Sequence, residues 1–238
     1  MSDPFGRAIR DHHRNEQDTP LVQRDGEETL QHPIERFYFG EFPDEEASGH
    51  WLDSWTDGPL LDMGAGAGRD TLYFQEQHET VAIEVSEHLV RTMRERGVDD
   101  ARQADMFALR ETFERDRFQS ALAIGTQLGL VGSIAGLRQF LADLSYVTTE
   151  DATAVFDCHD PACDETATLL GYRDDPTPGL AHRVMHFEYE GDVGETLLFR
   201  LFSPDRLREA AVGTGWEVAD IRYDSDVNVY YRAAMRKR

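Results

Sequence analysis

Apolar and polar residues alternate along this chain in the manner of short buried strands joined by amphipathic helices. Runs of small or β-branched apolar residues have the length of buried strands, and large apolar residues then recur at helical spacing. We expect strands at 60–63, 80–85, 102–104, 118–125 and 152–157, and helices at 69–77, 86–97 and 133–144. This alternation predicts an α/β fold with a Rossmann-like, doubly wound and mostly parallel sheet.

The segment 158–202, after the fifth strand, interrupts this alternation. Its first half is rich in proline and reads as a loop. Its second half contains two β-rich runs, 182–190 and 195–202, which flank Gly191-Asp192-Val193-Gly194. We therefore expect a loop and a β-hairpin inserted into the fold.

The last residues of the chain return to the helix and strand pattern. Ser203 is a suitable N-cap and Pro204 suits a first helical turn. Strands are expected at 217–223 and 228–235.

The first residues lack this regular pattern. Residues 1–30 are mostly polar and predict a flexible leader. Residues 31–57 carry aromatic side chains in two helical patterns, and we expect them to cover the sheet. Tyr38 in this cover can either pack on the sheet or line a pocket. The rest of the chain, residues 31–238, is expected to be a single domain.

One short stretch carries most of the chemistry. Leu60-Leu61-Asp62-Met63 is followed by Gly64-Ala65-Gly66-Ala67-Gly68, and a helical pattern begins at Arg69-Asp70. Glycines at this turn allow a sharp bend and let a ligand approach the main chain without a Cβ in the way. Arg69 and Asp70 are expected to fix the start of the helix, and Met63 to lie in the core.

Acidic residues stand at the ends of the first three strands. Asp62 precedes the glycine turn, Glu84 follows 22 residues later, and Asp105 a further 21. Ligands of open α/β sheets bind at the carboxyl ends of the strands, where an acid can accept hydrogen bonds from ribose hydroxyls. The glycine spacing differs from the dinucleotide motif, and Asp62 would repel a phosphate but attract an ammonium group. The pattern therefore favours a nucleoside that carries an amino-acid tail.

The charge of the chain restricts its partners. It has 46 acidic and 24 basic residues, a net charge of −22, and the acids are spread from end to end. Such a surface opposes nucleic-acid binding. Because molar salt screens self-repulsion, the dispersed acids favour a halophilic source over a single acidic patch for a basic partner. There is no signal peptide or apolar run that could span a membrane, so a cytoplasmic location is expected.

These motifs together resemble the class I S-adenosylmethionine-dependent methyltransferases. Asp62-Met63-Gly64-Ala65-Gly66-Ala67-Gly68 is similar to the glycine motif, Glu84 to the ribose acid and Asp105-Met106 to the adenine site. The chain ending, 203–237, is similar to the helix–strand–strand ending of that family. The resemblance implies a seven-stranded sheet with an antiparallel last strand, and methyl transfer from the sulfonium by in-line displacement.

The resemblance also implies which residues form the site. Cofactor-binding residues are then expected on the first four strands and their loops: Asp62, Gly64, Ala65, Gly66, Gly68, Glu84, Val85, Asp105, Met106 and Gly125. Substrate-side candidates are Thr126 and Gln127, with Asp157 at a strand end, and Tyr38 and His159 are the candidate catalytic residues.

The acceptor is expected to be a small molecule. Nucleic-acid amino methyltransferases tend to carry an Asn/Asp-Pro-Pro-aromatic motif after the fourth strand, where this chain has Ile124-Gly125-Thr126-Gln127. The inserted hairpin resembles the substrate lid of small-molecule methyltransferases. The alternative is a non-catalytic, methyltransferase-like module that binds a protein partner. A monomer or a homodimer is compatible with either.

No metal site is expected. His12-His13 lies in the polar leader without further ligands at metal spacing, and Cys158, His159 and Cys163 are closely bunched without a fourth ligand nearby.

Overall fold

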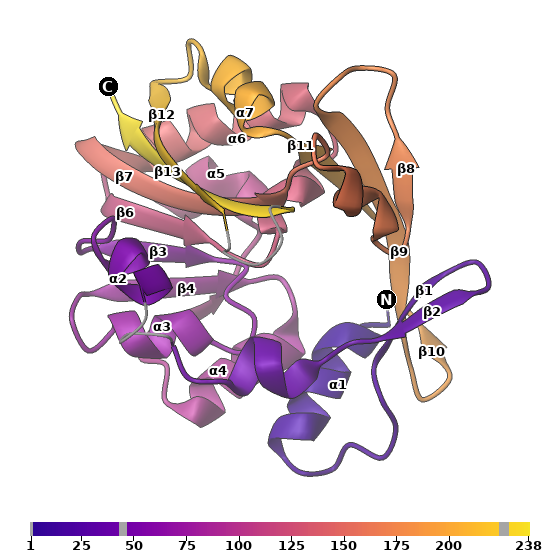
Figure 1. The fold of residues 1–238 in the computed structure, drawn as a ribbon. Helices are drawn as coiled ribbons and strands as arrows, with labels where there is room; N and C mark the ends of the chain where they lie inside the picture. The colour runs from indigo at the N-terminus through magenta and orange to yellow at the C-terminus, as the bar shows by residue number, and fades with distance from the viewer. Residues whose placement is uncertain (1, 43–46, 224–228) are drawn as a thin grey trace.

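The computed structural model describes residues 2–42, 47–223 and 229–238 and contains two sheets (Figure 1). The larger has seven strands in the order β12-β13-β7-β6-β3-β4-β5. Their bounds are β3 (Leu60–Met63), β4 (Thr80–Glu84), β5 (Ala101–Gln103), β6 (Phe118–Ala123), β7 (Thr148–His159), β12 (Trp216–Tyr223) and β13 (Tyr230–Lys237). Only β13 runs antiparallel to its neighbours. The predicted Rossmann-like sheet with an antiparallel last strand is confirmed.

Alternate residues of the central strand β3 pack on opposite faces of this sheet. Leu61 and Met63 join a core that includes residues of α6, whereas Leu60 packs with Leu52 and Phe74 on the other face. Both faces are covered, so all four residues of β3 are buried, Asp62 included. The helices are α1 (Pro4–His13), α2 (Ala47–Asp53), α3 (Arg69–Phe74), α4 (Glu87–Arg96), α5 (Leu109–Thr112), α6 (Ile134–Val147) and α7 (Pro204–Ala211).

The second sheet stands beside the first and contains the expected hairpin (Figure 1). Strands β9 (Leu180–Tyr189) and β11 (Leu197–Phe202) pair antiparallel, and β8 (Tyr172–Asp174) and β10 (Asp192–Val193) also pair with β9. Strands β1 (Val22–Asp25) and β2 (Glu28–Gln31) complete this sheet, with Val22 opposite Glu188. The insertion is thus larger than the predicted hairpin, because strands from the start of the chain extend it.

The first 30 residues differ from the flexible leader predicted for them. Asp3 caps α1 by accepting a hydrogen bond from the Gly6 N–H (2.8 Å), and Pro4 occupies the first turn. Helix α1 packs against α4 and β9, and Ala8 and Ile9 are fully buried. The burial of this helix depends on partners that are distant along the chain, which the polar composition of the segment did not reveal. In the part of the chain that the structure describes, no helix is long and apolar enough to cross a membrane.

Single-turn segments complete the chain. The π-helix η1 (Glu35–Phe39) lies in the predicted cover, and α2 follows it. The 3₁₀ turns are η2 (Met106–Ala108), η3 (Gln127–Val131) and η4 (Asp164–Thr168). Of these, η1 and η3 border the cavity described next.

Candidate functional site

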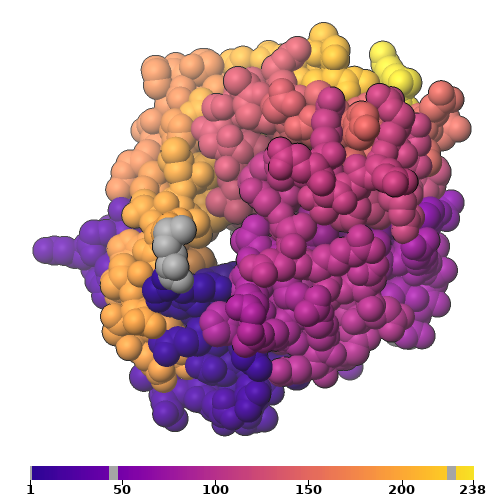
Figure 2. Space-filling model, turned by 180° about the vertical axis from the view of Figure 1, so that it is seen from behind, coloured from indigo at the N-terminus to yellow at the C-terminus, as the bar shows by residue number. Residues whose placement is uncertain are grey.

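A cavity of about 650 Å³ lies between the two sheets, at the carboxyl ends of β3, β6 and β7. In Figure 2 the molecule is hollowed between the indigo N-terminal segment and the magenta residues of the larger sheet. The glycine turn after β3, the π-helix η1 and the loop after β6 form much of its wall. It therefore occupies the edge of the sheet at which α/β folds bind their ligands.

The glycine turn presents bare main chain to this cavity. Gly64 and Gly66 have φ values of +66° and +58°, and both line the cavity. A Cβ on Gly64 would lie 2.8 Å from the Gln127 side chain, and one on Gly66 would lie 3.1 Å from the Tyr38 ring. Gly68, also predicted to bind cofactor, does not line the cavity; a Cβ there would meet Val98 at 2.8 Å. Glycine is therefore needed at position 68 because Val98 leaves no room for a side chain, not because a ligand binds there.

Asp62 lies at the floor of the cavity and is only 4% exposed. Its Oδ2 accepts a hydrogen bond from the Thr71 hydroxyl (2.6 Å). Burial, reinforced by the negative charge of Asp70, raises the pKa of Asp62 to about 7. A cation placed beside this carboxylate would restore its ionised form.

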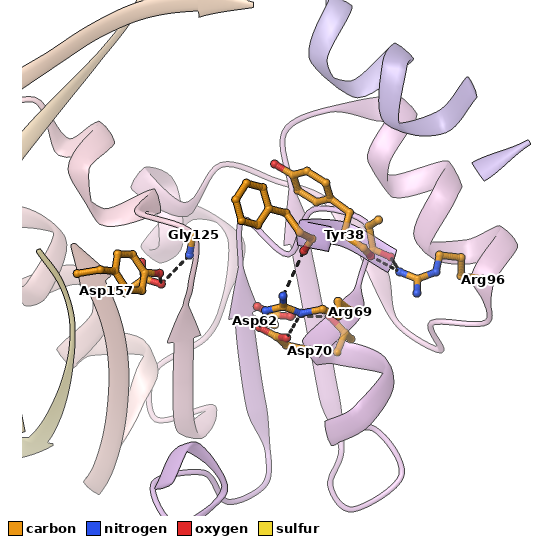
Figure 3. A network of polar contacts seen from close by, with 11 residues as sticks. Tyr38, Asp62, Arg69, Asp70, Arg96, Gly125 and Asp157 are labelled. Carbon is orange, nitrogen blue, oxygen red and sulfur yellow. Dashed lines mark hydrogen bonds and ion pairs between the residues drawn. The ribbon is translucent and has the colours of Figure 1, made fainter. Parts of the chain in front are cut away.

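Arginine side chains fix the elements around Asp62 (Figure 3). The Arg69 guanidinium bonds both oxygens of Asp70 (2.7 and 3.3 Å) and also donates to the Phe37 carbonyl. Arg96 donates to the carbonyls of Tyr38 (3.0 Å) and Ala67 (2.6 Å). These bonds hold η1 against the glycine turn, and they confirm that Arg69 and Asp70 tie down the start of α3.

Tyr38 is brought into the cavity by η1. Its ring lies over Gly66, and its hydroxyl is 3.0 Å from His32 Nε2. Burial raises the pKa of the Tyr38 hydroxyl above its ordinary value. Burial, followed by the charge of Arg183, lowers the pKa of His32 to about 4. Tyr38 therefore keeps its proton and His32 stays neutral near pH 7.

Glu84 lies behind the glycine turn and does not line the cavity. Its Oε2 accepts the Gly66 N–H (3.2 Å), and its Oε1 accepts the N–H groups of Val85 (2.8 Å) and Ser86 (3.2 Å). Burial raises the pKa of Glu84, and these three bonds oppose the rise. The carboxylate holds the turn in shape and retains acceptor capacity, since each oxygen has two lone pairs.

Asp105 is exposed and lies outside the cavity lining. Its Oδ1 accepts the Phe107 N–H (2.8 Å), which caps η2, and Met106 is buried in the core. The expectation that three strand-end acids share one cavity therefore holds only for Asp62. The strand ends are neighbours, but the Glu84 and Asp105 carboxylates turn to nearby backbone N–H groups.

Two apolar side chains are exposed beside these acids. Val85, directly after Glu84, is 60% exposed, and Phe107, two residues after Asp105, is 39% exposed. Gln103 donates to the Val85 carbonyl (2.9 Å), which joins the ends of β4 and β5. Exposed apolar side chains at a strand edge are suited to covering a flat ring.

The opposite wall is organised by Asp157 at the end of β7. Its oxygens accept the N–H groups of Gly125 (2.8 Å, Figure 3) and Thr126 (2.5 Å). Its Oδ2 also accepts the hydroxyl of Tyr230. Burial raises the pKa of Asp157, opposed first by the Tyr230 bond. The buried carboxylate thus positions the predicted residues Gly125 and Thr126, both of which line the cavity, as does Gln127.

His159 also lines this wall. It lies opposite Tyr230 in the antiparallel pairing of β7 with β13, and Asp157 lies opposite Arg232. Residues two apart on a strand share a face, so these four side chains project to one side. His159 Nδ1 is buried and has no hydrogen-bond partner among the described residues. Burial, followed by the Arg183 charge, lowers the pKa of His159 to about 4.

Several cavity residues escaped prediction. Five residues that line the cavity come from the supposed leader, the predicted cover, the hairpin and the last strand: Gln23, His32, Arg183, Tyr230 and Arg232. Tyr230 and Arg232 reach the cavity because β13 pairs with β7. The sequence did not reveal this pairing.

Neither predicted histidine motif is part of a metal site here. His12 contacts Gln17 through Nδ1 (2.7 Å) and Glu35 through Nε2 (2.8 Å). Cys158 is a buried free thiol. Across residues 2–42, 47–223 and 229–238, no group of three or more His, Cys, Asp or Glu side chains is placed to hold a metal ion.

Comparison with known proteins identifies relatives by structure only. No protein-family model matches the chain, and no curated protein sequence matches it. A solved structure of an S-adenosylmethionine-dependent methyltransferase from Bacteroides fragilis, in complex with S-adenosyl-L-homocysteine, superposes with a TM-score of 0.80. The match covers 99% of this chain and 94% of that one, at 22% sequence identity.

Two further structures match less closely. The 1,6-didemethyltoxoflavin-N1-methyltransferase of Burkholderia thailandensis, with bound 1,6-didemethyltoxoflavin and S-adenosylhomocysteine, gives a TM-score of 0.57 at 17% identity over 100% of this chain and 91% of that one. The CcbJ methyltransferase of Streptomyces caelestis gives 0.60 at 16% identity, covering 84% and 91%. The fold of this chain is therefore that of these methyltransferases, from the N-terminal helix to the last strand.

Proposed function

We propose that this protein is an S-adenosylmethionine-dependent methyltransferase that acts on a small-molecule acceptor. The observation that carries the proposal is the cavity wall formed by Gly64, Gly66 and the buried Asp62. This wall combines bare main chain with a carboxylate that forms no ion pair within the described part of the chain, because Arg69 is paired with Asp70.

The residues present fit this cofactor. Asp62 would hold its ammonium group, which compensates a carboxylate that burial leaves short of countercharge. Glu84 would accept a ribose hydroxyl with its remaining lone pairs. Val85 and Phe107 would cover the adenine ring, and Asp105 lies beside them. The proposal places the nucleoside at the ends of β4 and β5 and the amino-acid tail at the glycine turn.

Bound there, S-adenosylmethionine supplies an electrophilic methyl group that is already activated by its sulfonium. The chain itself then has to align the acceptor and exclude water. Tyr38 and Gln127 close over Gly66 and Gly64, so they are placed to enclose the reacting region. Thr126, held by Asp157, forms the acceptor side.

Proton removal from the acceptor would fall to His159. Its pKa of about 4 keeps it neutral at pH 7, and its buried Nδ1 has no partner among the described residues. Tyr38 is unsuited to this role because burial raises its pKa, so it serves as a hydrogen-bond donor or a wall.

A small acceptor is supported by the shape and charge of the molecule. Residues of the second sheet line one side of the cavity, and this sheet would hinder a polymer from entering the cavity. A net charge of −22 opposes a nucleic-acid backbone. The Burkholderia enzyme, which shares the fold, was solved with a small heterocycle bound.

The proposal is tested by incubating the protein with methyl-labelled S-adenosylmethionine and a small-molecule extract. We expect label in a compound that passes a small-molecule filter, and its loss with the Gly64→Ala variant. Label retained only on protein or nucleic acid would contradict the proposed acceptor. Stoichiometric capture of one protein partner without any methyl transfer would instead support a non-catalytic binding module.

A further inference from the structure

The charge of the cavity wall is opposite to that of the chain. The whole protein has nearly two acidic residues for each basic one. The side chains that line the cavity nevertheless include four arginines, Arg36, Arg69, Arg183 and Arg232, and only two carboxylates, Asp62 and Asp70. Arg69 pairs with Asp70, whereas Arg36, Arg183 and Arg232 have no ion pair with a carboxylate among the described residues.

Arg183 on β9 has only neutral partners. Its Nε donates to the Leu170 carbonyl (2.9 Å), and a terminal nitrogen donates to the Gln23 side-chain oxygen. Burial lowers the pKa of Arg183, and its charge lowers the pKa values of both His32 and His159. Within the described residues no carboxylate lies within 4 Å of its nitrogens. The positive charge of Arg183 therefore acts on both histidines of the cavity wall, and no carboxylate among the described residues pairs with it.

Arg232 on β13 provides a second positive charge on this wall, and this charge opposes the rise that burial causes in the pKa of Asp157. It lies opposite Asp157 in the strand pairing, on the same face as His159 and Tyr230. Its Nε is buried and has no hydrogen-bond partner among the residues described, and the same holds for His159 Nδ1. Buried polar atoms without partners are rare in folded proteins. Of the five such atoms among the described residues, these two belong to residues that line the cavity, where a polar ligand would supply the partner.

Apolar side chains form another part of the cavity lining. Leu30 is 51% exposed and Phe37 is 44% exposed, and both line the cavity, as does Leu169. Large apolar side chains that are exposed in a cavity are suited to contact the apolar part of a ligand.

We infer that the methyl acceptor joins an apolar body to an anionic group, a carboxylate or a phosphate, which binds between Arg183 and Arg232 beside His159. The inference rests on the proposed function, because it names the substrate class of that same cavity. Arginine suits this role since its planar fork can bond two oxygens of a carboxylate or phosphate at once. The apolar body would lie against Leu30 and Phe37.

The test uses simple probes and the whole chain. The protein, saturated with S-adenosylhomocysteine, is titrated calorimetrically with benzoate, phenyl phosphate and the neutral analogue benzamide at constant ionic strength. We expect benzoate or phenyl phosphate to bind at least tenfold more tightly than benzamide. The tighter of the two anions identifies the group that the site takes. Equal binding of all three would overturn the inference without any variant.

Matched variants locate the effect. Arg183→Gln and Arg232→Gln should each weaken anion binding about tenfold or more, as for loss of a charged hydrogen bond. Arg173→Gln is the control, because Arg173 lies on the adjacent strand β8 and pairs with Asp25 outside the cavity. Unchanged anion binding in both cavity variants would contradict the inference.

The two proposals fail separately. If S-adenosylhomocysteine does not bind but benzoate binding depends on Arg183, the anion site stands and the cofactor assignment falls. If S-adenosylhomocysteine binds and no anion is preferred over benzamide, the cofactor assignment stands and the anion site falls.

Discussion

Asp62 shows how a single buried residue can connect stability to binding. With its pKa raised to about 7, the folded chain holds a proton on Asp62 that an unfolded chain releases near pH 4. Stability therefore falls as pH rises from about 4 to about 7, since the folded state binds more protons in that window. A ligand cation beside Asp62 would reverse this loss.

The Asp62→Asn variant isolates that effect. Asparagine stays neutral, so the stability difference between variant and wild type should grow in favour of the variant as pH rises from 4 to 8, by up to about 4 kcal/mol. Urea unfolding at several pH values measures it. A difference that does not change with pH would show that Asp62 titrates normally.

Gly64 tests the role of bare main chain. Alanine at φ +66° costs about 1–2 kcal/mol, and its Cβ would also displace Gln127. Gly26→Ala is a matched control, because φ is +59° there but nothing lies within 4 Å. We expect both variants to lose stability in urea unfolding, and only Gly64→Ala to lose affinity for S-adenosylhomocysteine. Equal affinity in the two variants would remove the glycine turn from the site.

Individual residues differed in how far sequence could predict them. The glycine turn and Asp62 were predictable because their neighbours in sequence determine their setting. His32 and Arg183 were not, since they enter the cavity through the pairing of the β1–β2 hairpin with β9, which lies far away along the chain. Asp105 was placed in the site from its position at a strand end, but a backbone N–H two residues later binds its carboxylate.

At the scale of elements, the cavity depends on how η1 is held. Arg96 at the end of α4 bonds the carbonyls of Tyr38 and Ala67, and so joins η1, the glycine turn and α4. Hydrogen bonds from a charged donor contribute about 1.5–3 kcal/mol each. The residues of the π-helix are at most partly buried, so these bonds add to the support that Tyr38 and Phe39 gain by packing against the core.

Replacing Arg96 with methionine should therefore loosen η1 while leaving the larger sheet intact. Hydrogen exchange is expected to accelerate at residues 35–40, and affinity for S-adenosylhomocysteine to fall by about tenfold or more, as expected for loss of such bonds. Arg91→Met is the control on the same helix, because Arg91 pairs only with the exposed Glu87. Exchange that is unchanged at 35–40 would contradict this role.

The elements of the larger sheet were predictable because each strand and helix carries its own periodicity. Ser203 was recognisable as an N-cap, and it accepts a backbone N–H in the structure. The second sheet was predicted only as a hairpin. Its strands β1 and β2 are short, and β2 is exposed throughout, so their pairing partner determines them more than their own pattern does.

At the scale of the whole molecule, the dispersed negative charge is the dominant property. The proposal of a halophilic, cytoplasmic origin predicts that thermal unfolding shifts to higher temperature between 0.1 and 2 M KCl at pH 7.5, because salt screens self-repulsion. At a pH near the sequence pI of about 4.6, the same increase in KCl should shift the unfolding temperature much less, because the net charge is close to zero. An equal shift at both pH values would point to a salt effect unrelated to charge.

The central claim concerns the ligand of the glycine turn. Calorimetric titration of the wild-type chain with S-adenosylhomocysteine, with NAD as the competing nucleotide, tests it most directly. The account predicts one S-adenosylhomocysteine bound per chain and no binding of NAD. No heat of binding with S-adenosylhomocysteine, or tighter binding of NAD, would contradict it.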